Sequence, residues 1–318
     1  MIRALAVTGP TASGKTSLSL ALAEALGAEI VCCDSMQIYK RMDIGTAKAT
    51  SEERARAPHH MLDFLSPDRQ YSAEDYRSDA LAVAWEITER GRLPIFVGGT
   101  GLYIDTLMRG KQESPPSDPA LRDELTAIAN EEGGVDRLWQ MLRECDPASA
   151  EKTDKRNVRR VVRALEIFKL TGITKTAFDE ASRKVAPDIE IGLITLDFHN
   201  RDNLYQRIDE RVDIMMREGL LDEVRGLYND GLLLPEFTSS QAIGYKEIVA
   251  YLEEKCTLDE AIAEIKLSSR RYAKRQLTWF RHETDAMRVY MDGEDGKMRD
   301  ADDIFGEVMS FAKEFIGA

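Results

Sequence analysis

The sequence predicts an α/β fold, in which a parallel sheet is flanked by helices and interrupted by an inserted helical domain. Apolar runs alternate with amphipathic helical patterns over the first hundred residues, as is typical of parallel sheets. A long stretch in the middle of the chain has helical patterning without a convincing strand, and a buried-strand pattern follows it. At 318 residues the chain can form one large domain or two modest ones, each with an apolar core.

The first elements alternate in type. Strands are expected over residues 3–8, 29–33 and 93–97, and helices over residues 16–26 and 72–90. This order of strand, helix and strand predicts the core of the parallel sheet.

The middle of the chain begins with a predicted linker. Residues 111–119 contain three prolines and two serines, and the pattern is then helical to about Thr171. Residues 189–196 are expected to form a buried strand that rejoins the sheet, and almost everything after Arg201 is expected to be helical. The predicted domains are residues 1–113 as the first part of the core, residues 114–188 as the helical insertion, and residues 189–318 as the rest of the core with the C-terminal helices.

The composition excludes several classes of protein. The net charge of -13 repels nucleic acids and acidic membranes in general, so any basic patch is informative. No apolar run reaches the roughly 18 residues of a membrane-spanning helix. The four cysteines have no C-x-x-C spacing and the four histidines are scattered, so neither a zinc site nor a disulfide framework is indicated. We expect a cytoplasmic protein with no membrane association.

A phosphate-binding loop is predicted directly after the first strand. Residues 9–16, Gly-Pro-Thr-Ala-Ser-Gly-Lys-Thr, match G-x-x-x-x-G-K-[ST] and open the first helix. The glycines let backbone N–H groups converge on phosphate oxygens, the Lys15 ammonium neutralises charge, and the Thr16 hydroxyl can hold Mg²⁺. The alternative is an ordinary glycine turn. We expect a sheet of the P-loop NTPase type, with a diphosphate held by Gly9, Pro10, Thr11, Ala12, Ser13, Gly14, Lys15 and Thr16.

Two further strand ends carry polar residues. The second strand runs into Asp34, and the third runs into a glycine turn that contains Thr100. Ligands of such folds bind at the carboxyl edge of the sheet, so both side chains are expected beside the phosphate site. Asp34 is a candidate Mg²⁺ ligand or general base, and the alternative is a turn aspartate or a helix cap.

One predicted helix has a basic face. Arg156, Arg159, Arg160 and Arg163 follow i, i+3, i+4, i+7 spacing, and the apolar residues between them fall on the opposite face. A solvated face would normally mix charge signs. We expect this face to contact a polyanion.

A second basic segment spans residues 266–282. It contains six lysines and arginines and no acidic residue, and Tyr272 and Trp279 share one side of the predicted helix. With the arginine helix it suggests a channel for a nucleic acid strand. The alternative is that both aromatic residues belong to the core and the basic residues lie on the surface.

Arg207 and Arg211 lie one helical turn apart, after the strand that rejoins the sheet. One or both are expected to reach the phosphates. The alternative is pairing with acidic neighbours on the same helix.

These motifs, in this order, resemble the bacterial tRNA dimethylallyltransferase family over nearly the whole chain. The resemblance implies transfer of a dimethylallyl group from dimethylallyl diphosphate to N6 of adenosine 37, next to the anticodon, in tRNAs that read codons beginning with U. It rests on residues 9–16, 34–39 (Asp-Ser-Met-Gln-Ile-Tyr), 42–48 (Met-Asp-Ile-Gly-Thr-Ala-Lys), 58–60 (Pro-His-His), 71–73 (Tyr-Ser-Ala), 97–103 (Val-Gly-Gly-Thr-Gly-Leu-Tyr), 243–245 (Ile-Gly-Tyr) and 273–279 (Ala-Lys-Arg-Gln-Leu-Thr-Trp).

The resemblance also implies roles for individual residues. Asp34 would be the general base and Thr100 would steady the same amine, while Lys15, Thr16 with Mg²⁺, and Arg207 or Arg211 would stabilise the leaving diphosphate. The protein is expected to act as a monomer on the anticodon stem-loop of tRNA. The tRNA-binding residues implied are Asp34, Ser35, Met36, Gln37, Thr100, Arg122, Arg159, Arg160, Val161, Val162, Arg163, Ser240, Gln241, Ala242, Ile243, Gly244, Tyr245, Lys274, Arg275, Gln276 and Trp279.

Two other functions share the phosphate-binding loop. A small-molecule or nucleotide kinase would share the fold, Lys15 and Thr16, but does not predict two basic helical faces. A GTPase-type switch would require an Asn-Lys-x-Asp element, which the sequence lacks.

Overall fold

The computed structural model describes residues 1–108, 117–182, 187–283 and 285–317, and the chain divides into two compact units. The first unit consists of residues 1–108 and 189–318, and the second of residues 109–188. The predicted linker and the predicted boundary near residue 113 fall largely on residues 109–116, outside the described residues.

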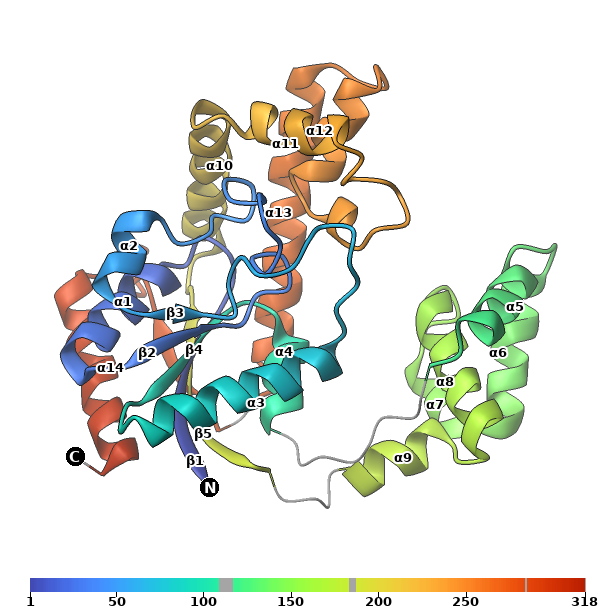
Figure 1. Ribbon diagram of the computed structural model, residues 1–318, viewed down its shortest axis with the longest axis horizontal. Helices are drawn as coiled ribbons and strands as arrows, with labels where there is room; N and C mark the ends of the chain where they lie inside the picture. The colour runs from blue at the N-terminus through green and yellow to red at the C-terminus, as the bar shows by residue number, and fades with distance from the viewer. Residues whose placement is uncertain (109–116, 183–186, 284, 318) are drawn as a thin grey trace. The chain divides into compact units, whose positions relative to one another are not determined.

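One sheet of six parallel strands forms the centre of the first unit (Figure 1). The strand order is β3-β2-β4-β1-β5-β6, which confirms the predicted α/β class. Four of these strands were predicted, whereas β3 and β6 were not. β3 has only two residues, and β6 has four residues of which one is buried, so neither produces a recognisable sequence pattern. The strands are β1 (Ile2–Thr8), β2 (Glu29–Cys32), β3 (His59–His60), β4 (Pro94–Gly98), β5 (Ile189–Asp197) and β6 (Met287–Tyr290).

Helices cover both faces of this sheet (Figure 1). α1 (Lys15–Leu26) and α14 (Ala301–Ile316) pack on the face that carries Leu5 and Val7 of β1, and α3 (Ala73–Glu89) and α4 (Gly101–Met108) pack on the face that carries Ala4 and Ala6. Because both faces are buried, the central strands are apolar throughout, as the sequence pattern indicated. A short helix, α2 (Ser51–Arg56), precedes β3.

A group of C-terminal helices lies at the carboxyl end of the sheet (Figure 1). Their core includes Ile38, Tyr39 and Met42, from the segment that follows β2. The sheet and these helices are therefore joined through the same segment that carries Asp34. The elements are α10 (Arg201–Arg217), α11 (Leu220–Asn229), the 3₁₀ helix η1 (Ser239–Gln241), α12 (Tyr245–Leu252) and α13 (Leu258–Phe280).

The second unit is helical over its described residues, 117–182. α5 begins after Asp118, which caps it through the Leu121 N–H, and α8 begins after Asn157, which caps it through the Arg160 N–H. None of the described helices in either unit is both long and apolar enough to cross a membrane. The helices of this unit are α5 (Pro119–Ala129), α6 (Gly134–Cys145), α7 (Pro147–Lys152), α8 (Val158–Thr171) and α9 (Lys175–Ser182).

Candidate active site

The predicted phosphate-binding loop runs from Gly9 to Gly14, the N-cap of α1. Gly9, Ala12 and Gly14 have positive φ angles of 139°, 61° and 93°. A Cβ at Gly9 would lie 2.7 Å from the Leu196 carbonyl oxygen, so only glycine fits there. The first N–H groups of α1 have no acceptor within the helix. The loop therefore offers an anion both backbone donors and the positive end of a helix dipole.

The Lys15 ammonium group folds back over this loop. Its Nζ donates hydrogen bonds to the Gly9 oxygen at 3.1 Å and to the Pro10 oxygen at 2.6 Å. The pKa of Lys15 is lowered to about 7. Burial is the largest cause and the positive charge of Arg211 the second, and the negative charge of Asp34 acts in the opposite direction. The buried Ser13 hydroxyl nearby has no hydrogen-bond partner among the described residues. Both groups would gain a partner from a phosphate oxygen.

Two arginines of α10 lie at the same loop. The Nε of Arg207 donates a hydrogen bond to the Ala12 oxygen at 2.9 Å. Burial lowers the pKa of Arg211, whereas the negative charge of Asp34 raises it. Within the described ranges neither arginine has a carboxylate at ion-pair distance, and the neighbouring Asp209 instead pairs with Arg270 of α13. Both guanidinium groups therefore remain available to a phosphate.

Asp34 lies just beyond the end of β2. Its Oδ1 accepts a hydrogen bond from the Met36 N–H at 2.9 Å, so the local turn that the sequence left as an alternative is present. The carboxylate lines the same cavity as Lys15 and Arg211, and its negative charge opposes the lowering of their pKa values. Thr100, beyond the end of β4, accepts a hydrogen bond from the Ser35 N–H at 3.0 Å. The two predicted strand ends therefore meet.

These groups share one cavity of about 890 Å³. The phosphate-binding loop and the segment 34–37 form one part of its lining, and α10 and α13 form another. The cavity is lined by Lys15, Thr16, Asp34, Arg207 and Arg211 among others, and Ser35 lines it while Thr100 supports Ser35.

The cavity also has an apolar wall, which the sequence analysis missed. Ile208, Val212 and Met215 of α10 and Ile265 of α13 line it. The i, i+4, i+7 spacing of the three α10 residues could have revealed this face. A site that combines cations, a carboxylate and apolar side chains suits a ligand with an anionic group and a hydrocarbon group.

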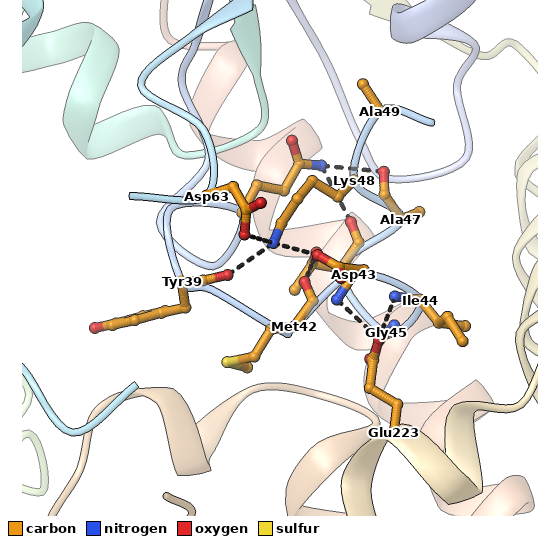
Figure 2. Close-up of polar contacts among 12 residues, drawn as sticks. Tyr39, Met42, Asp43, Ile44, Gly45, Ala47, Lys48, Ala49, Asp63 and Glu223 are labelled. Atoms are coloured by element: carbon orange, nitrogen blue, oxygen red, sulfur yellow. Dashed lines mark hydrogen bonds and ion pairs between the residues drawn. The ribbon is translucent and has the colours of Figure 1, made fainter. Parts of the chain in front are cut away.

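Gly45, Thr46 and Ala47 line a further part of the cavity. They belong to the loop of residues 42–48, whose polar contacts Figure 2 shows. Glu223 of α11 accepts hydrogen bonds from three successive N–H groups, those of Asp43 at 2.9 Å, Ile44 at 2.8 Å and Gly45 at 3.1 Å. The Tyr245 hydroxyl donates a fourth bond to this carboxylate at 2.6 Å. Glu223 thereby fixes the loop to the C-terminal helices.

Two further side chains, those of Lys48 and Gln37, connect this loop to the segment that follows β2, and Figure 2 shows the contacts of Lys48. The Lys48 ammonium is buried and contacts the Tyr39 oxygen and the carboxylates of Asp43 and Asp63. The Gln37 Nε2 donates to the Thr46 oxygen at 3.1 Å. The Gln37 side chain, implied as a tRNA ligand, is thus engaged with the loop in this structure.

Most basic residues of the segment 266–282 have acidic partners, although the segment itself contains no acidic residue. Lys266 pairs with Asp213 at 2.6 Å, Arg270 with Asp209 at 2.6 Å, and Arg281 with buried Asp197 at 3.3 Å. Lys274 and Arg275 are exposed and have no carboxylate at ion-pair distance in the described part of the chain. They are the cations of this helix that remain available to a polyanion.

The two aromatic residues of α13 differ in their surroundings. Tyr272 lines the cavity. Its pKa is raised, chiefly by burial and next by the negative charge of Asp34, and the phenol is protonated at neutral pH. Trp279 packs against Gly101, where a Cβ would lie 2.4 Å from its ring, and it belongs to the core under α3 and α4. Gln276, also implied as a tRNA ligand, is buried and bonded to Thr11 and Gly99.

The predicted arginine face of α8 needs one correction. Arg156 lies before the helix, is 84% exposed and pairs with Asp154, because Asn157 is the N-cap. Arg163 and Arg122 of α5 pair with Glu166, whose side chain is fully buried. Arg159 and Arg160 are exposed and have no ion pair within the described residues of this unit. Val161 and Val162 have buried side chains in the core of the unit, which leaves the arginines on the exposed side.

The segment 240–245 lies at the edge of the same cavity. Gln241, Ala242, Ile243 and Gly244 line it, whereas Tyr245 is buried against Glu223.

The donor atoms present fit Mg²⁺ only if phosphate oxygens complete its coordination. No group of three His, Cys, Asp or Glu side chains suited to a metal occurs in the described portion of the chain. Mg²⁺ commonly takes one or two protein oxygens together with waters and phosphate oxygens. The Thr16 hydroxyl and the Asp34 carboxylate line one cavity and provide oxygens of this kind.

Comparisons with known proteins identify the family of this chain. Residues 37–283 match the family model described as IPP transferase, and residues 2–63 match the model described as isopentenyl transferase. A tRNA dimethylallyltransferase of Bacillus cereus is 47% identical over 293 residues, which cover 92% of this chain and 90% of the relative. One from Bacillus anthracis is 46% identical, with 92% and 91% covered.

Solved structures show the same relationship. The full-length tRNA isopentenylpyrophosphate transferase of Bacillus halodurans superposes with a TM-score of 0.73 at 41% identity, covering 100% of this chain and 97% of that one. A eukaryotic dimethylallyltransferase acting on tRNA superposes with a TM-score of 0.77 at 28% identity, covering 91% and 74%. The matches span both the phosphate-binding loop and the C-terminal helices that complete the cavity, and the chain therefore belongs to the IPP transferase family of enzymes.

Proposed function

We propose that this enzyme transfers a dimethylallyl group from dimethylallyl diphosphate to N6 of adenosine 37, next to the anticodon, in tRNAs that read codons beginning with U. The bond between N6 and the allylic carbon forms as the bond from that carbon to the diphosphate oxygen breaks. One N6 proton leaves, and diphosphate is the second product. The names of the relatives support both the prenyl group and the tRNA.

The leaving diphosphate would occupy the loop from Gly9 to Thr16. Lys15, Arg207 and Arg211 are positioned to stabilise the charge that develops on the oxygen as its bond to carbon breaks. The unpartnered Ser13 hydroxyl would donate a hydrogen bond to the same group. Hydrogen bonds from Lys15 to the Gly9 and Pro10 oxygens and from Arg207 to the Ala12 oxygen hold the loop in place before the substrate binds.

Mg²⁺ would be held by the Thr16 hydroxyl together with diphosphate oxygens and water. Bound there, the ion would neutralise charge on the leaving group.

The acceptor amine would lie at Asp34. The lone pair of the adenine N6 is delocalised into the ring, so the amine needs a base that removes its proton as the new bond forms. The Asp34 carboxylate lies at the cavity beside Ser35, which Thr100 holds through its N–H. The target base must leave its stack to enter the cavity, which favours an unpaired loop nucleotide.

The dimethylallyl group would contact the apolar wall formed by Ile208, Val212, Met215 and Ile265. This wall holds the hydrocarbon part of the donor while the cations hold its anionic part. It also excludes water, which would otherwise compete with the amine for the allylic carbon.

The exposed and unpaired cations are the best candidates for RNA phosphates. These are Lys274 and Arg275 on α13, and Arg159 and Arg160 on α8. A tRNA substrate together with bacterial relatives implies that the reaction takes place in the cytoplasm.

One observation carries the proposal, namely that three cations, Asp34 and an apolar wall share a single cavity. The protein is incubated with tRNA, dimethylallyl diphosphate and Mg²⁺, and the digested tRNA is examined by mass spectrometry for N6-(dimethylallyl)adenosine. Unmodified tRNA, together with transfer of the γ-phosphate of ATP to a small molecule, would establish the kinase function instead.

A further inference from the structure

A single glutamine side chain joins the two loops that carry the candidate catalytic groups. Gln276 belongs to α13, and only 5% of its surface is exposed. Its Oε1 accepts a hydrogen bond from the Thr11 N–H at 2.9 Å, and its Nε2 donates one to the Gly99 oxygen at 2.9 Å. Thr11 belongs to the phosphate-binding loop, and Gly99 precedes Thr100. Both ends of the amide are therefore used within the protein.

The neighbouring glycine is shaped to receive this amide. A Cβ at Gly99 would lie 2.1 Å from the Gln276 Nε2 and 3.3 Å from the Gly9 oxygen. The φ angle of Gly99 lies outside the left-handed region, so space and not backbone conformation excludes other residues here. A Cβ at this position would displace the amide that makes both hydrogen bonds.

The location of Gln276 gives these bonds a functional meaning. The phosphate-binding loop holds Lys15 and Ser13, while the Gly99 turn positions Thr100, which in turn holds Ser35 beside Asp34. Tyr272 and Arg275, on the same helix as Gln276, line the same cavity. One side chain thus contacts both the phosphate-binding loop, on the diphosphate side of the cavity, and the turn that contains Thr100, on the acceptor side.

We propose that Gln276 is a positioning residue, which holds the phosphate-binding loop and the Thr100 turn in a fixed relation and ties both to α13. The inference rests on the proposed function for the assignment of the two sides of the cavity. The resemblance to the family had implied that Gln276 binds tRNA. The proposal instead assigns it a role within the protein.

The substitution Gln276→Glu tests the donated hydrogen bond through its pH dependence. The ionised carboxylate can still accept from the Thr11 N–H, but it cannot donate to the Gly99 oxygen and it opposes the diphosphate charge. At pH 8 we expect Gln276→Glu to weaken binding of inorganic pyrophosphate about tenfold relative to the wild type. Because burial at this position should raise the pKa of the introduced carboxyl, the ratio of the two dissociation constants should shrink toward pH 6, where more of the carboxyl is protonated and regains an O–H donor. Calorimetry at each pH measures this ratio.

Two further variants separate positioning from general loss of stability. Gln276→Met removes both hydrogen bonds without adding charge, so its ratio to the wild type should not change with pH. The same chemical change at exposed Gln140 of α6, Gln140→Glu, should leave pyrophosphate binding unchanged. Equal, pH-independent effects of Gln276→Glu and Gln276→Met would overturn the proposal.

A double-mutant cycle tests the contact itself. Gly99→Ala places a Cβ against the Gln276 amide and should weaken pyrophosphate binding in the wild-type background. In a Gln276→Ala background the space is open, so the same substitution should have a smaller effect. Equal effects in both backgrounds would contradict the inference. Pyrophosphate binding needs neither prenyl donor nor RNA, so these results stand even if the wild type transfers no prenyl group.

Discussion

The guanidinium of Arg207 donates a hydrogen bond from Nε to the carbonyl oxygen of Ala12 at 2.9 Å, across 195 residues of sequence. Ala12 is a non-glycine residue with a φ angle of 61°, a conformation that usually requires compensation from its surroundings. Since the Arg207 side chain supplies that contact, α10 stabilises the phosphate-binding loop as well as adding a positive charge to it.

We therefore expect Arg207→Met to weaken pyrophosphate binding by about 10 to 10²-fold, because it removes a charge-assisted donor and the support of Ala12. Arg207→Lys keeps the charge and should recover part of the affinity. Arg217 lies at the exposed end of the same helix, and Arg217→Met is the matched control. Calorimetric titration with pyrophosphate measures all three. Equal affinities for the wild type and Arg207→Met would remove Arg207 from the site.

The depressed pKa of Lys15 predicts that donor binding depends on pH. The free enzyme holds Lys15 with a pKa of about 7, and a bound diphosphate should raise it, so binding takes up a proton above pH 7. The dissociation constant of pyrophosphate should be nearly constant below pH 7 and rise toward tenfold per pH unit above it. Lys15→Arg, which stays charged, should lose this dependence after correction for the ionisation of pyrophosphate. The same slope in both proteins would show that Lys15 does not titrate in this range.

Arg211 should control that pKa. Its positive charge is the second largest cause of the low pKa of Lys15, so Arg211→Met should raise the pKa and move the onset of the pH dependence above pH 7. An onset that stays at pH 7 would exclude this electrostatic coupling.

Asp34→Asn tests the base. The amide keeps the size of the side chain and can still accept from the Met36 N–H, but it cannot take a proton. We expect turnover to fall by roughly 10² to 10⁴, with tRNA binding nearly intact. Asp230→Asn, at an exposed residue paired with Arg41, is the control. Single-turnover measurements with saturating tRNA and donor separate the chemical step from binding. Turnover at the wild-type rate would exclude Asp34 as the base.

The sequence was sufficient to predict local structure where one short segment contains all the residues of a motif. The loop from Gly9 to Thr16 has its strand, its glycines and its helix within a few residues, so its structure follows from local rules. Asp34 could be placed because parallel strands end at one edge of a sheet.

Long-range pairing was not predictable in the same way. Lys266 and Arg270 form no acidic contacts within their own segment, and their partners Asp213 and Asp209 lie on a different helix. The same holds for the ion pair between Arg122 and Glu166, which depends on how α5 and α8 pack, although Glu166 also pairs with Arg163 one turn away on its own helix. The prediction from the run of basic residues therefore overestimated the number of cations available to RNA, because tertiary contacts decide which of these cations form ion pairs.

The arginines of α8 should contribute unequally to tRNA binding. Arg160 is exposed without a partner among the described residues, whereas Arg156 already pairs with Asp154. Arg160→Glu should weaken tRNA binding and flatten its dependence on salt, because fewer counterions are released. Arg156→Glu is the matched charge reversal and should have a smaller effect. Filter-binding at several salt concentrations gives both slopes, and an unchanged slope for Arg160→Glu would return this helix to an ordinary solvated face.

The carboxylate of Glu223 should matter for the acceptor side of the cavity and not for the diphosphate side. It accepts hydrogen bonds from three backbone N–H groups of the loop that lines the cavity (Figure 2). Gln37, three residues after Asp34, also donates a hydrogen bond to this loop. In Glu223→Gln one acceptor oxygen becomes an NH₂ group that faces N–H donors. We expect the free energy of unfolding to fall by about 1 to 3 kcal/mol, since these donors lose their partner.

The functional effect of Glu223→Gln distinguishes positioning from stability alone. A loosened loop should lower turnover and raise the KM for tRNA, while pyrophosphate affinity stays at the wild-type value because the phosphate-binding loop makes none of these contacts. Tyr245→Phe removes one of the four donors and should show a smaller change in the same direction. Glu218→Gln, at an exposed residue that ends α10, serves as the control. If Glu223→Gln lowered pyrophosphate affinity and turnover in the same proportion, the carboxylate would stabilise the whole site, and its contacts with residues 43–45 would have no separate part in placing the acceptor.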